Sequence, residues 1–100
     1  MLKRVLVVDD DDMNLMRTKK ILGNEYDVFF ASSGVEALDT MKREKMDLVL
    51  LDIEMPRMNG FETFERMKEF AADTPVIFLT ASGQEDDVVS AIRLGAVNYL

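Results

Sequence analysis

Carboxylates follow two apolar runs of this sequence. Asp9 and Asp10 come directly after Val5–Val8. Asp52 comes directly after Leu48–Leu51. A carboxylate can act as a covalent nucleophile toward phosphorus, and carboxylates that lie together repel one another until a cation binds. Their types predict cation-assisted phosphoryl chemistry, with Asp52 as the acceptor.

A hydroxyl and the composition extend this prediction. Thr80 follows the apolar run 76–79 and could donate a hydrogen bond to a phosphoryl oxygen. The 100 residues contain no histidine and no cysteine, which excludes a serine-histidine hydrolase, a thiolate zinc site and a phosphohistidine relay within the chain. Oxygen ligands alone favour a hard ion, magnesium, with manganese as the alternative.

Each of these residues also has an ordinary structural explanation. Asp12 is better read as a helix cap than as a ligand. Asp52 taken alone would often be a turn residue, and a threonine such as Thr80 commonly bonds to backbone at the end of a strand. The functional prediction therefore depends on the combination of side chains at three strand ends. No lysine or arginine is placed to act as a counter-charge for phosphate.

Five apolar runs alternate with helical patterns along the chain, which is typical of βα units that build a parallel sheet. Most runs are apolar throughout, as expected for strands that helices cover on both faces. The second run is the most polar and is expected at an edge. The predicted strands are Val5–Val8, Val28–Ala31, Leu48–Leu51, Val76–Leu79 and Ala96–Leu100.

The predicted fold is a doubly wound, flavodoxin-like α/β domain. Open α/β sheets place their sites at the carboxyl ends of strands, at the point where the strand order reverses. If the strand order is 2-1-3-4-5, the first and third strands are neighbours, and Asp9, Asp10 and Asp52 converge.

Capping residues mark where the helices between these strands begin. The first helix is expected to be capped by Asp12 and to bury Met13, Met16 and Leu22, and methionine is expected mainly as core filler. The later helices begin with a Ser or Asn followed three residues on by Glu, the spacing of a capping box. These pairs are Ser33 with Glu36, Asn59 with Glu62, and Ser82 with Glu85.

Composition narrows the class of protein further. The formal net charge of -7 argues against binding of nucleic acid or anionic membrane by this segment. No apolar run is long enough to span a bilayer, and no secretory signal is recognisable, so a cytoplasmic location is expected. One domain is expected over residues 1–100. The pattern stops at the fifth strand without a fifth helix, so we expect a domain incomplete at its C-terminus, with exposed apolar surface and self-association.

The sequence resembles the receiver domains of two-component response regulators over all 100 residues. The resemblance rests on five segments that begin or end the predicted strands. They are Val5-Leu6-Val7-Val8-Asp9-Asp10-Asp11, Leu48-Val49-Leu50-Leu51-Asp52-Ile53-Glu54-Met55-Pro56, Asn59-Gly60, Pro75-Val76-Ile77-Phe78-Leu79-Thr80-Ala81 and Gly95-Ala96-Val97-Asn98-Tyr99-Leu100.

The resemblance implies a phosphorelay function. It implies that Asp52 accepts a phosphoryl group from a sensor histidine kinase or a phosphotransfer protein. It implies magnesium held by Asp10, Asp52 and the backbone carbonyl of Glu54, with Asp9 contributing. No other cofactor is implied. A receiver is not a classical enzyme, although it assists its own phosphorylation and dephosphorylation.

The resemblance also assigns residues around the acceptor. Thr80 matches the switch hydroxyl, and Tyr99 matches the aromatic residue that turns inward when that hydroxyl meets the phosphoryl group. Glu54, Ala81 and Ser82 occupy positions that modulate the phosphoryl group. The family's lysine would fall two residues after the last residue of this chain. The output domain or effector is not indicated.

Three alternatives remain at the level of sequence. A phosphatase of the haloacid-dehalogenase type also uses an aspartate after an apolar strand, but it needs a second aspartate where this chain has Glu54. A flavodoxin would need a first loop that cradles phosphate, which the acidic run after the first strand opposes. A non-phosphorylating interaction fragment is the third, and the intact set of acidic residues argues against it.

Overall fold

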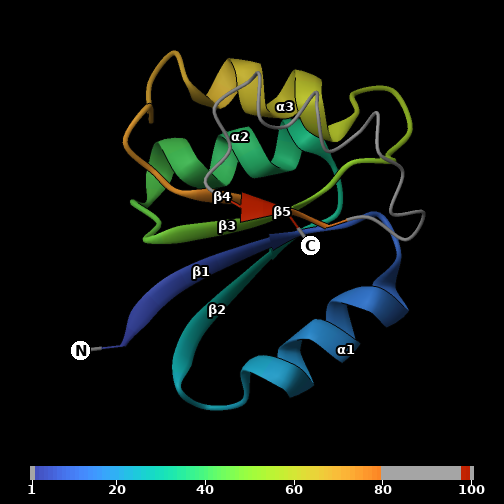
Figure 1. Ribbon diagram of the computed structural model, residues 1–100, viewed down its shortest axis with the longest axis vertical. Coiled ribbons are helices and arrows are strands. Elements are labelled where there is room, and N and C mark those ends of the chain that lie inside the picture. Colours follow the sequence, from blue (N-terminus) through green and yellow to red (C-terminus); the bar gives the residue numbers. More distant parts are fainter. Residues whose placement is uncertain (1, 80–97, 100) are drawn as a thin grey trace.

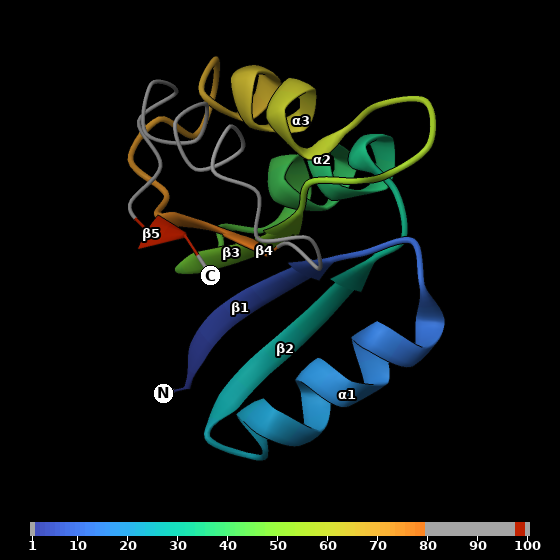
Figure 2. The same cartoon turned by 45° about the vertical axis from the view of Figure 1, so that its right-hand side comes forward.

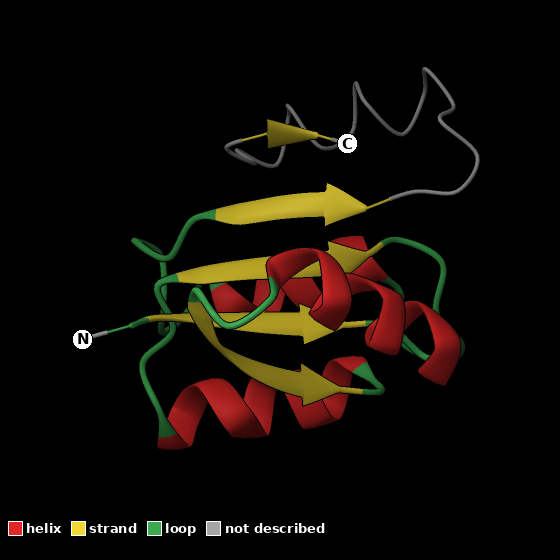
Figure 3. Ribbon diagram, turned by 90° about the horizontal axis from the view of Figure 1, so that it is seen from below, coloured by secondary structure: helices red, strands yellow, loops and turns green. Residues whose placement is uncertain are grey.

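A parallel sheet runs through the centre of the computed structural model, which describes residues 2–79 and the backbone of 98–99. The strand order is 2-1-3-4-5, and every pair of neighbours is parallel (Figure 3). The predicted fold class and strand order are therefore confirmed. The strands are β1 (Lys3–Val8), β2 (Tyr26–Ala31), β3 (Leu48–Asp52), β4 (Val76–Leu79) and β5 (Asn98–Tyr99).

Helices cover both faces of the sheet. α1 (Asp12–Leu22) lies on one face, and α2 (Gly34–Arg43) and α3 (Gly60–Met67) lie side by side on the other (Figures 1 and 2). None of the helices in the described part of the chain could cross a membrane. A sheet covered in this way must be apolar on both faces.

The strand β1 shows why the apolar runs are continuous. Val5 and Val7 belong to the core cluster on the α1 side, whereas Leu6 and Val8 belong to the cluster on the side of α2 and α3. All four side chains are at most 1% exposed. Successive side chains of a strand point to opposite faces of the sheet. A strand that is buried on both faces therefore has apolar residues at every position, with no alternation of apolar and polar residues. By contrast β2 is more exposed and forms one edge, as predicted.

Two expectations for α1 were wrong. The N-cap is Asp11, whose carboxylate accepts a hydrogen bond from the Met13 backbone N–H at 2.9 Å, and Asp12 is the first helical residue. Met13 and Met16 are 72% and 63% exposed, so they do not fill the core. Leu15 is buried instead, and it shares one helix face with Leu22 seven residues later, which packs against the same cluster as predicted.

The capping boxes are confirmed for α3 and only half formed for α2. Asn59 and Glu62 exchange hydrogen bonds in both directions, at 2.9 and 3.3 Å. The Ser33 hydroxyl accepts from the Glu36 backbone N–H at 3.1 Å, but the Glu36 carboxylate accepts from Ser32 rather than reaching back. The third pair predicted, Ser82 with Glu85, lies outside the described residues.

The core on the α2 and α3 side is centred on Phe78, which has no exposed surface. Its ring lies 5.1 Å from that of Phe61 and 5.4 Å from that of Phe64, centroid to centroid. We expect Phe78→Ala to lower the free energy of unfolding by about 3–5 kcal/mol in urea denaturation, because it leaves a cavity that the sheet cannot close. Phe70→Ala, at a ring that is 42% exposed, should cost less than about 1 kcal/mol. Equal losses would contradict this description of the core.

Candidate functional site

Three carboxylates meet where β1 and β3 end. In the sheet Val8 is paired with Leu51, so the next residues, Asp9 and Asp52, lie side by side at the carboxyl ends of the two strands. One carboxylate oxygen from each of Asp9, Asp10 and Asp52 lies within 4.8 Å of the others. Asp9 is only 7% exposed, Asp52 is half-buried and Asp10 is exposed. The predicted convergence of these side chains is confirmed.

Hydrogen bonds hold the first of these carboxylates in place. The Asp9 backbone N–H donates to the Ala31 carbonyl at 3.0 Å, which ties the end of β1 to β2. The Asp9 carboxylate accepts from the Asp11 backbone N–H at 3.0 Å and from the Asn14 side chain. Asp11 itself caps α1, so the acidic residues after β1 have two roles: Asp9 and Asp10 belong to the site, and Asp11 stabilises the start of the helix.

The loop after β3 packs tightly around the acceptor. The Ile53 backbone N–H donates to the Leu79 carbonyl at 3.2 Å, and the Gly60 N–H donates to the Ile53 carbonyl at 2.8 Å. A Cβ on Gly60 would overlap the Asp52 carbonyl oxygen and stand 2.8 Å from the Ile53 Cα. Only glycine lets the first turn of α3 lie this close to the strand end that carries Asp52.

Burial and mutual repulsion make both inner carboxylates hard to ionise. Burial raises the pKa of Asp9, and the nearby charge of Asp10 adds to the rise against the lowering effect of the Asp11 N–H. Burial, reinforced by the charge of Asp9, raises the pKa of Asp52 to about 7. A hydrogen bond from the Glu54 backbone N–H to Asp52 lowers it in part. The metal-free site therefore favours protons or cations near neutral pH.

The geometry suits a hard cation. An octahedral ion with ligands at about 2.1 Å spans oxygen-oxygen distances of roughly 3 to 4 Å, so the three oxygens need move by only about an ångström to share one ion. All three ligands are carboxylate oxygens, as such an ion prefers. The residues present thus fit a magnesium-type ion.

The other predicted site residues lie outside the described part of the chain or next to the carboxylate cluster. Thr80, Ala81 and Ser82 lie outside the described residues. Tyr99 lies in β5, where its backbone is in register with Phe78, and its side chain is outside the described part. Glu54 is exposed beside the acceptor, and its backbone N–H contacts the Asp52 carboxylate.

Sequence reasoning missed two residues that shape the site. Asn14 lies in the first turn of α1, and its side chain forms a hydrogen bond with the Asp9 carboxylate. Its position in an expected helix did not predict this contact. Gly60 supports the end of β3 through the absence of a side chain. Asn59-Gly60 was among the segments that carry the family resemblance, but the close packing of Gly60 against the acceptor strand was not predicted.

Fold and site together define a class: a flavodoxin-like domain with an acidic site at the carboxyl ends of neighbouring parallel strands. The family model described as "Response regulator receiver domain" matches residues 5–100. The chain belongs to the response regulator receiver domain family.

Known proteins of this family resemble the chain over its whole length. The chemotaxis protein CheY of Halobacterium salinarum is 38% identical over 101 residues, covering 100% of this chain and 84% of the relative. The transcriptional regulatory protein CrdR of Helicobacter pylori is 38% identical over 102 residues, covering 100% of this chain. A crystal structure of a CheY-like receiver domain protein from Methanospirillum hungatei superposes with a TM-score of 0.91 at 35% identity, covering 100% of this chain and 81% of that one.

Some of these relatives are much longer than the chain. It spans 48% of CrdR and 22% of the transcriptional regulatory protein ZraR of Klebsiella oxytoca, which is 39% identical over 97 residues covering 96% of this chain. The similarity therefore concerns the receiver domain of such proteins.

The raised pKa of Asp52 predicts how stability depends on pH in the metal-free chain. The folded protein holds this proton more tightly than the unfolded chain, whose carboxyl has the ordinary value of 3.8, so stability should fall as pH rises from about 4 through about 7. We expect Asp52→Asn to flatten this fall and to raise the melting temperature at pH 8 more than at pH 5, measured in EDTA. Asp39→Asn, at an exposed carboxylate of α2, is the control. An unchanged pH slope in Asp52→Asn would contradict the prediction.

Backbone strain lies in the loop that follows the acceptor. Arg57 has φ 69°, and the Met58 N–H donates to the Pro56 carbonyl at 2.8 Å, so the chain makes a tight γ-turn at a residue with a side chain. We expect Arg57→Gly to raise the free energy of unfolding by roughly 0.5–1 kcal/mol in urea denaturation, because glycine removes more strain than its added unfolded-state entropy costs. Arg57→Ala keeps the Cβ and should give no gain. Equal gains from both would assign the effect to the lost charge.

Proposed function

We propose that this chain is the phosphoacceptor of a phosphorelay, and that Asp52 takes up the phosphoryl group. The observation that carries the proposal is the convergence of three carboxylates within 4.8 Å in a receiver domain. The donor is a sensor histidine kinase or a phosphotransfer protein. The chain acts as a partner in phosphoryl transfer rather than as a classical enzyme, and it works in the cytoplasm.

Asp52 is the nucleophile because its carboxylate is half-buried at the end of β3 and faces the other two acidic side chains. One Asp52 carboxylate oxygen attacks phosphorus, and the bond between phosphorus and the donor nitrogen breaks with its electron pair on that nitrogen. The donor ring takes up one proton to become neutral imidazole, and Asp52 becomes an acyl phosphate. The attacking carboxylate must be ionised. A pKa of about 7 in the metal-free chain means that this form is not fully populated at neutral pH.

The ligands proposed for the divalent cation are Asp9, Asp10, Asp52 and the Glu54 backbone carbonyl. When bound, magnesium neutralises charge on the transferring phosphoryl group. Asp9 is fixed for this task by the Asp11 N–H and by Asn14, so it contributes a ligand without rearrangement. Exposed Asp10 can adjust its side chain to complete the set.

The response to phosphorylation is assigned to residues beyond the carboxylates. Thr80 and Tyr99 form the proposed switch, and Glu54, Ala81 and Ser82 modulate the lifetime of the phosphoryl group. Because the transcriptional regulatory protein CrdR is about twice as long as this chain, an output domain or a separate effector is the proposed reader of the switch.

Incubation with acetyl phosphate and magnesium tests the proposal. We expect intact-protein mass spectrometry to show a gain of one phosphoryl group that is lost in Asp52→Asn and absent when EDTA removes the metal. Asp39→Asn, which removes an exposed carboxylate of α2, should be phosphorylated like the parent. No mass gain, or a gain that survives in Asp52→Asn, would overturn the proposal.

A further inference from the structure

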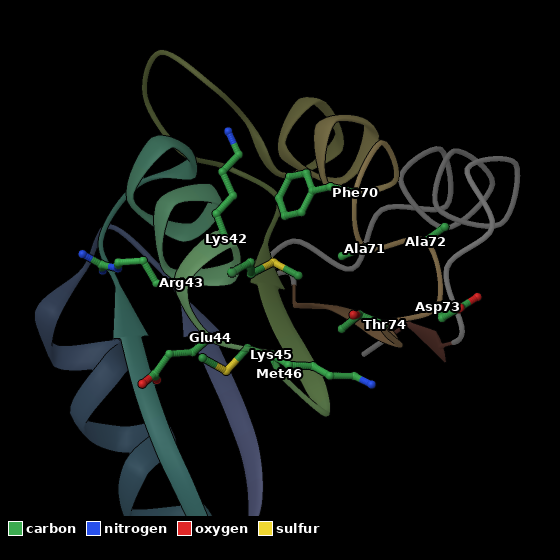
Figure 4. Close-up of a pocket in the computed structure, with 11 residues that line it drawn as sticks. Lys42, Arg43, Glu44, Lys45, Met46, Phe70, Ala71, Ala72, Asp73 and Thr74 are labelled. Carbon is green, nitrogen blue, oxygen red and sulfur yellow. The ribbon is translucent and has the colours of Figure 1, made fainter.

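A cavity lies at the end of the sheet opposite the carboxylates. Its volume is about 360 Å³, and it is lined by the segments 41–46 and 70–74 (Figure 4). The first segment leads from the end of α2 into β3, and the second leads from the end of α3 into β4. Since these strands are parallel, the cavity sits at their amino ends, and Asp52 sits at the far end of β3.

The floor of this cavity is apolar and adaptable. Met41 and Met46 are 8% and 2% exposed, and methionine side chains adjust readily to the shape of a bound group. Phe70 forms one wall with 42% of its surface exposed. An exposed aromatic ring beside flexible apolar side chains is typical of the centre of a protein interface.

The rim of the cavity carries basic side chains in an acidic chain. Lys42, Arg43 and Lys45 line it, whereas the whole chain has a net charge of -7. Among the residues that the structure describes, no ion pair within 4.0 Å involves any of the three. Figure 4 shows Lys42 beside Phe70, with its ammonium 5.5 Å from the ring centroid, and Lys45 extending on the side of Thr74.

Two acidic side chains, Glu44 and Asp73, also line the cavity. Figure 4 shows the carboxylates of Glu44 and Asp73 pointing outward, and Arg43 also pointing away from the cavity. Lys42 and Lys45 therefore remain as cations on two sides of an apolar floor. A ligand that matches them needs negative charges flanking an apolar group.

We propose that this cavity binds an acidic peptide segment of a partner protein. A phenylalanine or similar side chain of the peptide packs on Met41 and Met46 beside Phe70, and its flanking carboxylates meet Lys42 and Lys45. A volume of about 360 Å³ is at the small end of ligand cavities, which suits one anchor side chain. Because the cavity and the acidic site lie at opposite ends of the strands, the partner leaves Asp52 accessible.

A fluorescein-labelled peptide, Glu-Asp-Phe-Glu-Asp, titrated with the 100-residue chain and followed by fluorescence anisotropy, tests this assignment. We expect saturable binding that Phe70→Ala and the double variant Lys42→Glu/Lys45→Glu each weaken about tenfold or more. The double variant Lys19→Glu/Lys20→Glu makes the same charge change at the exposed end of α1 and should alter affinity by less than about twofold. A peptide with lysines in place of its acidic residues should not bind.

Four results would overturn the proposal. The first is the absence of saturable binding. The second is equal weakening by the Lys19→Glu/Lys20→Glu variant, which would indicate diffuse electrostatic attraction. The third is weaker binding to Asp52→Asn, which would place the peptide at the acidic site. The fourth is displacement of the peptide by free phenylacetate at a matching affinity, which assigns the cavity to small organic anions. None of these results depends on phosphorylation, so the proposal stands or fails apart from the proposed function.

Discussion

The structure depends on one unfavourable arrangement, the crowding of Asp9, Asp10 and Asp52 at the end of buried strands. Desolvation and like-charge repulsion both oppose ionisation there, and two backbone N–H groups and the Asn14 amide relieve them only in part. The net result is a raised pKa for Asp9 and Asp52. This cluster does not stabilise the fold, because an apolar residue or an asparagine at the same positions would have a smaller cost in folding free energy. The cluster is therefore best understood through the cation that its carboxylates fit and the phosphoryl group proposed for Asp52.

The surrounding fold keeps these side chains from moving apart. β1 and β3 are central strands whose residues 5–8 and 49–51 are buried, so Asp9 and Asp52 are held at fixed positions at the strand ends. The Asp9 N–H donates to the Ala31 carbonyl of β2, and the Ile53 N–H donates to the Leu79 carbonyl of β4, so the chain beside each carboxylate is held by a neighbouring strand. Gly60 then lets α3 close against the acceptor strand. Relaxation by separation of the carboxylates would break these bonds, and binding of a cation does not.

The sequence predicted the strands well because apolar runs are local patterns, and it predicted their order only through the fold class that the alternation of strands and helices indicates. Continuous apolar runs indicate buried parallel strands, and the site followed once strands one and three were neighbours. The face of α1 was harder to predict. Met13, Met16 and Leu15 are all apolar, and only packing against the sheet decides that Leu15 turns inward. Asp11 and Asp12 are equally good N-cap residues by type. Which of them caps α1 depends on the residue at which β1 ends and the helix begins. Asn14 and Gly60 act through space, and single-sequence periodicity carries no signal for such contacts.

The same topology separates charge along the molecule. Each of α1, α2 and α3 returns antiparallel to the strands, so its first turn lies near the acidic end of the sheet and its last turn lies near the opposite end. The last turns carry Lys19 and Lys20 in α1, and Lys42 and Arg43 in α2, as the helix dipole favours. A chain with a net charge of -7 thereby carries basic side chains at the end opposite its acidic site, where Glu44 and Asp73 also lie. The acidic site and the cavity are separated by the length of the strands. The cation and the acidic segment that we propose for them would therefore interact only weakly with each other.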